Sequence, residues 1–260
     1  MLTERYGVLG WPVGHSRSPA MMQAAGLRRY QRLPVAPEAF ADTVGALGAL
    51  GFRGANVTIP HKEAALAVAT SASDAAREIG AANTLTFGPG GAIHADNTDA
   101  PGLLAALGRA PRSALVLGAG GSARAAVWAL GRAGADVSIW NRTARRARDL
   151  GARVVAEPVA AEVLVNCTSV GLDDSSSPFK DLPLTADGLL EYATVVDLVY
   201  RAGGTALIRE ADQRGIATVD GLEILVRQGA LSFTLWTGLA APLDTMRTAA
   251  RNSRPEANVS

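Results

Sequence analysis

The sequence has little of the chemistry that builds disulfide frameworks and metal centres. Its 260 residues include one cysteine, Cys167, and three histidines. A single cysteine forms no intramolecular disulfide, which fits a reducing compartment. No two histidines are spaced as metal ligands, so we expect no metal site.

An excess of one charge and long apolar runs are also absent. The 25 Lys and Arg residues against 24 Asp and Glu residues give a net charge of 25 − 24 = +1, where a nucleic-acid binder normally shows a basic excess. No apolar stretch approaches the roughly 18 residues of a membrane span. The opening MLTERYGVLG contains Glu4 and Arg5 and does not resemble a signal peptide. We therefore expect a cytoplasmic protein that binds neither nucleic acid nor membrane.

Apolar runs that alternate with helical stretches dominate the middle of the chain. The composition, 48% hydrophobic and 19% charged, is that of a globular protein, and the length suits one large or two modest domains. Four strands are predicted, at Ala114–Leu117, Asp136–Trp140, Val163–Val165 and Val195–Val199. Fully apolar strands separated by helices indicate a parallel sheet covered on both faces.

The rest of the chain also has a mixed α/β pattern. Further strands are predicted at Tyr6–Leu9 and Ala55–Ile59, with a hairpin of Thr84–Phe87 and Ala92–Ala95 around four turn residues. Helices are predicted at Glu38–Leu50, His61–Ala69, Asp74–Gly80, Gly102–Leu107 and Leu222–Trp236. The polar tail from Pro255 is expected to fray.

A glycine-rich motif follows the strand at Ala114–Leu117. The residues Gly118-Ala119-Gly120-Gly121-Ser122-Ala123 fit the pattern G-x-G-x-x-G/A and open a helix. In this pattern the first glycine permits a tight turn, the second lets the backbone approach a pyrophosphate, and the small sixth residue allows close helix packing. A plain glycine-rich turn is the alternative, but the flanking strand and helix favour dinucleotide binding.

The end of the next strand indicates which dinucleotide binds. An NAD site usually has an acidic residue there, on the ribose hydroxyl. Here the strand ends in Trp140-Asn141-Arg142-Thr143, with Arg145 and Arg146 close behind. Guanidinium groups suit a 2′-phosphate, so the pattern favours NADP over NAD, although a solvated basic helix face would look the same.

The first hundred residues contain a separate set of polar side chains. Ser16 and Ser18 place two hydroxyls in one turn at a helix start, which suits a small carboxylate. Helix capping by Ser18, with Pro19 at the first helical position, explains the second serine equally well. Lys62 follows the strand that contains Asn56 and Thr58 and is by itself most simply a surface lysine. Asp99 alone is most simply the N-cap of the helix at Gly102.

Taken together, these segments resemble the NADP-dependent shikimate dehydrogenase family. The matching pieces occur in the family's order from residue 7 to about 240. They are Gly14–Pro19, Asn56–Glu63, Gly80–Thr84, Asp96–Asp99, Gly118–Gly121, Asn141–Thr143, Asn166–Gly171, Asp197–Tyr200 and Gly221–Ala230.

The resemblance implies a two-domain α/β fold and the reduction of 3-dehydroshikimate to shikimate with NADPH. A substrate domain would comprise residues 1–100 with 222–260, and a Rossmann-type doubly wound parallel-sheet domain would comprise residues 101–221 and bind NADP(H). No oligomeric state is implied beyond monomer or homodimer.

The resemblance also implies a role for individual residues. Lys62 and Asp99 would be the catalytic pair and would also contact the substrate. The other substrate-binding residues would be Ser16, Ser18 and Tyr200 at the carboxylate, and Thr58, Asn83 and Gln228 at its other polar groups. The cofactor-binding residues would be Gly118, Ala119, Gly120, Gly121, Ser122, Ala123, Asn141, Arg142, Thr143, Arg146, Thr168, Ser169, Val170, Leu198 and Gly221.

Three alternatives stay open on the sequence. A quinate/shikimate dehydrogenase that uses NAD would share the fold, but Arg142 in place of an acidic residue argues against NAD. A catalytically silent NADPH-binding sensor would also share the fold, because fold alone does not fix function. A methylene-tetrahydrofolate dehydrogenase is a third, against which Ser16, Ser18 and Gln228 argue.

Overall fold

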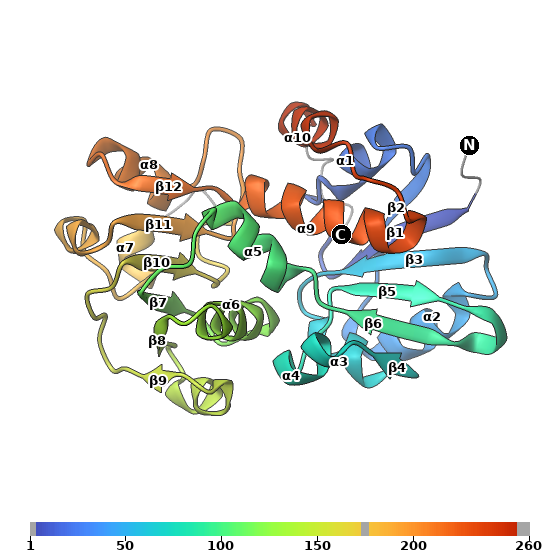
Figure 1. Cartoon of the computed structure of the whole chain (residues 1–260), viewed down its shortest axis with the longest axis horizontal. Helices are drawn as coiled ribbons and strands as arrows, with labels where there is room; N and C mark the ends of the chain where they lie inside the picture. Colours follow the sequence, from blue (N-terminus) through green and yellow to red (C-terminus); the bar gives the residue numbers. More distant parts are fainter. Residues whose placement is uncertain (1–3, 173–176, 254–260) are drawn as a thin grey trace. The chain divides into compact units, whose positions relative to one another are not determined.

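The structure, a computed structural model, describes residues 4–172 and 177–253 and consists of two units (Figure 1). The described residues of Met1–Thr98 and Val226–Ser260 form the first unit, and those of Asp99–Leu225 form the second. One limit between the units falls within helix α9 (Gly221–Thr237). The tail from Pro255, expected to fray, lies outside the described residues.

The first unit contains a mixed six-stranded sheet in the order β2-β1-β3-β5-β6-β4. The strands are β1 (Arg5–Gly10), β2 (Arg29–Pro34), β3 (Phe52–Val57), β4 (Ser71–Ala72), β5 (Thr84–Phe87) and β6 (Ile93–Asp96). β1 is parallel to both β2 and β3, and β4 is parallel to β6. β5 runs antiparallel to β3 and β6, and the predicted hairpin of β5 and β6 is confirmed.

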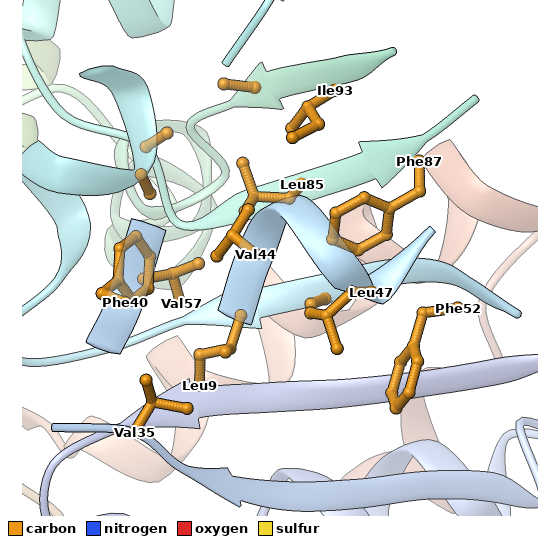
Figure 2. Close-up of a cluster of buried hydrophobic side chains, with 14 of the residues drawn as sticks. Leu9, Val35, Phe40, Val44, Leu47, Phe52, Val57, Leu85, Phe87 and Ile93 are labelled. Carbon is orange, nitrogen blue, oxygen red and sulfur yellow. The ribbon is translucent and has the colours of Figure 1, made fainter. Parts of the chain in front are cut away.

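One face of this sheet forms the apolar core of the first unit. The helices α2 (Phe40–Leu47), α3 (Lys62–Ala67) and α4 (Asp74–Ile79) contribute to that core. Figure 2 shows Phe40, Val44 and Leu47 of α2 beside Val57 and Leu85 of the sheet. All five side chains are at most 3% exposed, so the apolar positions of α2, spaced at the period of a helix, form one buried face.

The opposite face of the sheet packs against α9 through aromatic side chains. The ring centroids of Tyr6 and Trp236 lie 5.2 Å apart, and Gly54 leaves room for Trp236, since a Cβ there would overlap the indole. The helices α1 (Ser18–Ala24) and α10 (Leu243–Asn252) pack together in this unit. Buried Arg17 ties them, because its Nη1 donates to the Ala250 carbonyl oxygen over 3.1 Å.

The second unit contains an entirely parallel sheet in the order β12-β11-β10-β7-β8-β9. Its strands are β7 (Ser113–Leu117), β8 (Asp136–Trp140), β9 (Arg153–Val154), β10 (Val163–Asn166), β11 (Thr194–Asp197) and β12 (Ala217–Val219). Counted within the unit, this is the Rossmann order, with the switch point between β7 and β10. The predicted doubly wound parallel sheet is confirmed.

Helices contribute to two separate apolar clusters of the second unit, as its apolar strands predict. One cluster includes residues of α5 (Asp99–Leu107) and α6 (Gly121–Arg132). The other includes Leu207 and Ala211 of α8 (Ala206–Gln213) and the partly buried Phe179 of α7 (Pro178–Asp181). Short 3-10 turns occupy Pro37–Ala39, Pro89–Gly91, Ala144–Leu150 and Asp187–Glu191.

Two helix starts differ from the sequence-based expectation. Ser18 is the first residue of α1 and not its N-cap, since its own N–H donates to the Ser16 hydroxyl over 3.3 Å. Asp99 is the first residue of α5, so the helix begins three residues before the predicted Gly102. Asp99 therefore lies within the helix and is not its N-cap residue. A carboxylate in the first turn is favourable because it faces the positive end of the helix dipole.

Several boundaries were also wrong by a few residues. The strand expected at Ala55–Ile59 spans Phe52–Val57, so Thr58 lies just beyond it, and the strand expected to reach Val199 ends at Asp197. The stretch at Glu38–Leu50 begins as a 3-10 turn and is α-helical only over Phe40–Leu47. In the described part of the chain, no helix is long and apolar enough to cross a membrane.

Candidate functional site

The glycine-rich loop of the second unit lies at the carboxyl ends of three strands. The Gly118 N–H donates to the Trp140 carbonyl at the end of β8, and the Cys167 N–H donates to the Leu117 carbonyl, both over 2.8 Å. Gly118 has φ +108°, and a Cβ there would lie 3.1 Å from the backbone carbon and oxygen of Cys167. Both the turn and its close contact with the segment after β10 therefore require glycine.

Gly120 differs, because the protein's own packing does not explain it. It is exposed, it is the N-cap of α6, and no atom of the described chain lies within 4 Å of a Cβ built there. A ligand that approaches the backbone closely would explain the glycine. The 12-residue helix that starts here offers N–H groups and the positive end of its dipole. Ala123 is fully buried, as close packing of α6 requires.

The segment after β8 presents exposed cations. Arg142, Arg145 and Arg146 are all exposed, and Asn141 shapes the turn by donating from Nδ2 to the Thr143 carbonyl over 2.9 Å. Within residues 4–172 and 177–253, no carboxylate forms an ion pair with any of these three arginines. Their charges are therefore not neutralised by a described side chain.

A buried polar network fixes the loops after β10 and β11. Asn166 accepts from the Thr168 hydroxyl over 2.7 Å and donates to Asp197 over 2.9 Å. Asp197 also accepts from the Val199 N–H over 3.1 Å and from the Thr205 hydroxyl over 2.6 Å. Thr168 in turn accepts from the Val170 N–H over 3.1 Å, so the Thr168–Val170 turn is tied to the sheet.

Burial changes the acidity of this network's carboxyl group. Asp197 is fully buried, and that burial raises its pKa to about 6, against the lowering effect of hydrogen bonds from Thr205, Val199 and Asn166. Sequence reasoning assigned Asp197 and Asn166 no role of their own. Their positions at the ends of two adjacent parallel strands are the signal that could have identified them.

Gly221 at the start of α9 packs directly on the loop after β11. A Cβ at Gly221 would lie 2.5 Å from the Leu198 carbonyl oxygen and 2.7 Å from that of Val199. The carboxyl side of this sheet thus joins the predicted residues of the Gly118–Ala123 motif, the Thr168–Val170 turn, and Leu198 with Gly221. Tyr200, half-buried, follows two residues after Leu198.

The first unit contains a buried cluster of amide and hydroxyl groups. Asn83 donates from Nδ2 to the Thr98 hydroxyl over 3.0 Å and to the Gln228 Oε1 over 3.1 Å. Its Oδ1 accepts from the Thr98 N–H over 2.7 Å. These three residues are at most 7% exposed. The structure therefore brings together Asn83 and Gln228, which are 145 residues apart in sequence.

A second layer of polar residues supports this cluster, and sequence reasoning missed most of it. Ser232, one helical turn after Gln228, lies 2.8 Å from both Asn56 Nδ2 and the Thr84 hydroxyl, and 3.2 Å from the Thr98 hydroxyl. Tyr30 on β2 donates its hydroxyl to Asn56 Oδ1 over 2.8 Å. Neither Ser232 nor Tyr30 belongs to a local motif, since their partners lie far away in sequence.

The Ser16–Ser18 turn is also in the first unit. Both serines are 4% exposed, and Ser16 accepts from the Ser18 N–H. Arg32 of β2 donates from Nε and Nη2 to the Ser16 carbonyl oxygen over 3.0 and 2.7 Å. The pKa of neighbouring His15 is lowered, first by burial and then by the positive charge of Arg32.

The two residues expected to be catalytic belong to different units. Half-buried Lys62 begins α3, and its carbonyl accepts from the Ala82 N–H over 2.8 Å, one residue before Asn83. Thr58, four residues earlier, is half-buried and donates its N–H to the Leu9 carbonyl over 2.8 Å. Asp99 follows Thr98 of the cluster and opens the second unit. Among the described residues, no group of three or more His, Cys, Asp or Glu could hold a metal ion.

The fold and the candidate site together define a class of protein. The chain is a two-unit α/β protein in which a Rossmann-type nucleotide-binding sheet accompanies a mixed sheet with a buried polar cluster. Residues 8–85 match the family model described as the shikimate dehydrogenase substrate binding domain, and residues 221–251 match the shikimate 5'-dehydrogenase C-terminal domain.

Known relatives cover nearly the whole chain. A shikimate dehydrogenase (NADP(+)) from Thermus thermophilus is 45% identical over 96% of this chain and 98% of its own length. One from Methanocella arvoryzae is 41% identical over 95% of this chain and 98% of its own length. A crystal structure of a Thermus thermophilus shikimate 5-dehydrogenase with NADP(H) and shikimate covers 96% of this chain and 99% of its own, with 43% identity and a TM-score of 0.85. The chain belongs to the shikimate dehydrogenase family.

Proposed function

We propose that this protein reduces 3-dehydroshikimate reversibly to shikimate with NADPH, in the pathway to chorismate and the aromatic amino acids. The observation that carries the proposal is the 43% identity, over 96% of the chain, to an enzyme whose structure holds both NADP(H) and shikimate. The buried amide and hydroxyl cluster of the first unit supports it, because a polyhydroxylated ring acid needs such hydrogen-bond partners.

The second unit binds NADP(H). Gly118 and Gly120 bring the backbone to the pyrophosphate, and the start of α6 adds N–H donors. Arg142 and Arg146 hold the 2′-phosphate together with Asn141 and Thr143. The two guanidinium groups suit this role because no described carboxylate neutralises their charges. The remaining contacts, on the nicotinamide side, come from Thr168, Ser169, Val170, Leu198 and Gly221.

The first unit, residues 1–100 with 222–260 by the sequence-based limits, binds the substrate. Ser16, Ser18 and Tyr200 bind the carboxylate. Thr58, Asn83 and Gln228 bind the ring hydroxyls. Asn83 and Gln228 suit this role since hydrogen bonds to Thr98 and to each other already fix their amide groups.

Lys62 and Asp99 form the catalytic pair. NADPH, when bound, supplies the hydride that the carbonyl carbon accepts. The carbonyl oxygen then becomes an alkoxide, and Lys62 stabilises its charge and gives it a proton. Asp99, the other member of the pair, contacts the substrate. In the reverse direction Lys62 takes the proton back.

We further propose that the protein acts in the cytoplasm, which its single cysteine supports. Shikimate and NADP(H) are its small-molecule partners. It works as a monomer or a homodimer without nucleic acid, membrane or metal.

The test of the catalytic role uses the two lysines of this chain, Lys62 and Lys180. Lys62→Ala should lower turnover by about 100-fold or more, the scale of a general acid–base group, while NADPH binding followed by fluorescence is unchanged. Lys180→Ala, which removes the same charge from exposed α7, should keep wild-type turnover. Near-normal turnover of Lys62→Ala would contradict the assignment.

A further inference from the structure

Arg32 on β2 has no role in the proposed chemistry, yet it contacts the Ser16–Ser18 turn. Two of its nitrogens, Nε and Nη2, donate to the single carbonyl oxygen of Ser16 over 3.0 and 2.7 Å. Because a guanidinium is planar and rigid, two bonds to one acceptor fix the direction of that peptide group as well as its position. Arg32 is half-buried, so these bonds are partly shielded from water.

The register of the sheet places Arg32 on the face with the polar cluster. Arg32 pairs with Val8, Val8 with Asn56, and Asn56 with Thr84. Paired residues of neighbouring strands point to the same face, so Arg32 shares its face with Asn56 and Thr84. Tyr30, two residues earlier on β2, lies on this face too and donates to Asn56.

The Ser16 hydroxyl can donate a hydrogen bond to a ligand. Its oxygen accepts from the Ser18 N–H over 3.3 Å, and among the described residues its hydrogen is donated to no protein acceptor. The positive charge of Arg32 extends to this turn, since it contributes to the lowered pKa of His15. Hydroxyl donors beside a fixed guanidinium are suited to an anion.

We infer that Arg32 is a positioning residue for the substrate carboxylate. Its two bonds hold the Ser16 peptide, and thereby the turn with both hydroxyls, while its charge favours an anionic group there. This inference rests on the proposed function, in which Ser16 and Ser18 bind the carboxylate of a hydroxylated ring acid.

The experiment compares three variants of the full-length protein. Arg32→Gln removes the charge, Arg32→Lys keeps it without the planar pair of donors, and Arg28→Gln removes an equal charge from an exposed residue four positions earlier. Since a hydrogen bond to a charged group contributes a factor of about 10, Arg32→Gln should raise the KM and the Kd for shikimate about tenfold. Its kcat should change less than about twofold, and its Kd for NADPH should match wild type. Arg32→Lys should fall between, and Arg28→Gln should match wild type.

Salt provides a second readout that a merely structural role would not change. Added NaCl should raise the shikimate Kd of the wild type and of Arg32→Lys more steeply than that of Arg32→Gln, because screening acts on the charge. An unchanged shikimate Kd in Arg32→Gln, or a parallel fall of kcat, NADPH affinity and Tm, would overturn the inference. If the wild type binds shikimate without turnover, only the proposed reaction fails, and the Kd values still test Arg32. If it binds no shikimate, both fail.

Discussion

At the scale of single residues, Asp197 has the most strongly shifted pKa among the carboxyl groups that the structure describes. Its ordinary pKa of 3.8 is raised to about 6 by burial, although three hydrogen bonds favour the charged form. A carboxyl group with a raised pKa binds its proton more tightly in the folded protein than in the unfolded chain. It therefore stabilises the fold below pH 3.8, and this stabilisation is lost as the pH rises through about 6.

Asp197→Asn tests this pH dependence. An asparagine still accepts from Asn166 and Val199, and it does not titrate. Between pH 3.5 and 7, the free energy of unfolding of the wild type should fall by about 3 kcal/mol relative to that of Asp197→Asn. Denaturant unfolding at several pH values measures the difference, and a difference that is constant over this range would contradict the raised pKa.

Arg142 is the single residue that bears most directly on the choice between NADP and NAD. Arg142→Ala should weaken binding of NADPH about tenfold or more and leave binding of NADH nearly unchanged, because only NADPH has the 2′-phosphate. Arg132→Ala is the matched control, since it removes an exposed arginine at the C-terminal end of α6, the end away from the glycine-rich loop. Fluorescence titration of the wild type and both variants gives the affinities for NADPH and NADH, and an equal loss for both cofactors in Arg142→Ala would refute the phosphate contact.

At the scale of elements, α9 contains two glycines with very different surroundings. A Cβ at Gly221 would meet backbone atoms of Leu198 and Val199, which cannot move without shifting the loop after β11. A Cβ at Gly229 would meet the terminal methyl groups of Met21 and Met22, which are flexible side chains. An alanine at position 221 therefore requires backbone to move, whereas an alanine at position 229 requires only side chains to move.

Gly221→Ala should destabilise the protein by about 2 kcal/mol and weaken NADPH binding, because overpacking against backbone is costly. Gly229→Ala should stay within about 1 kcal/mol of wild type, since the gain in helix propensity offsets the small shift of the methionines. Unfolding in urea provides both values. Equal losses of unfolding free energy in the two variants would contradict the expected overpacking against the Leu198 backbone.

The strength of the local pattern decided which elements the sequence predicted. β7, β10 and β11 are short strands with buried apolar residues at their centres, and all three were predicted within two residues of their limits. β2 was missed because its sequence RYQRLP contains two arginines and buries only Tyr30. α10 was missed too, since it buries only Met246 and Ala250. Edge strands and exposed helices leave weak signals because few of their side chains enter the core.

At the scale of the whole molecule, the sequence pattern indicated candidate site residues but not the buried residues that contact and support them. The glycine-rich loop and its switch point follow from local pattern and strand order. The contacts of Asn83 with Gln228, and of Asn56 with Ser232, join residues 145 and 176 positions apart. No local period predicts such contacts, so Gln228 was identified through family resemblance alone, and Ser232 and Arg32 were not identified. The pairing of Lys62 with Asp99 stays a prediction.

The most direct test is the initial rate of nicotinamide reduction by the purified wild type on a grid of shikimate and quinate, each with NADP and with NAD. Turnover confined to shikimate with NADP is the predicted result, because it requires the substrate, the cofactor and the 2′-phosphate contact together. Comparable turnover with NAD would contradict the cofactor preference argued from Arg142, and comparable turnover with quinate would contradict the proposed substrate. No turnover in any combination, with NADPH binding intact, would contradict the proposed reaction itself.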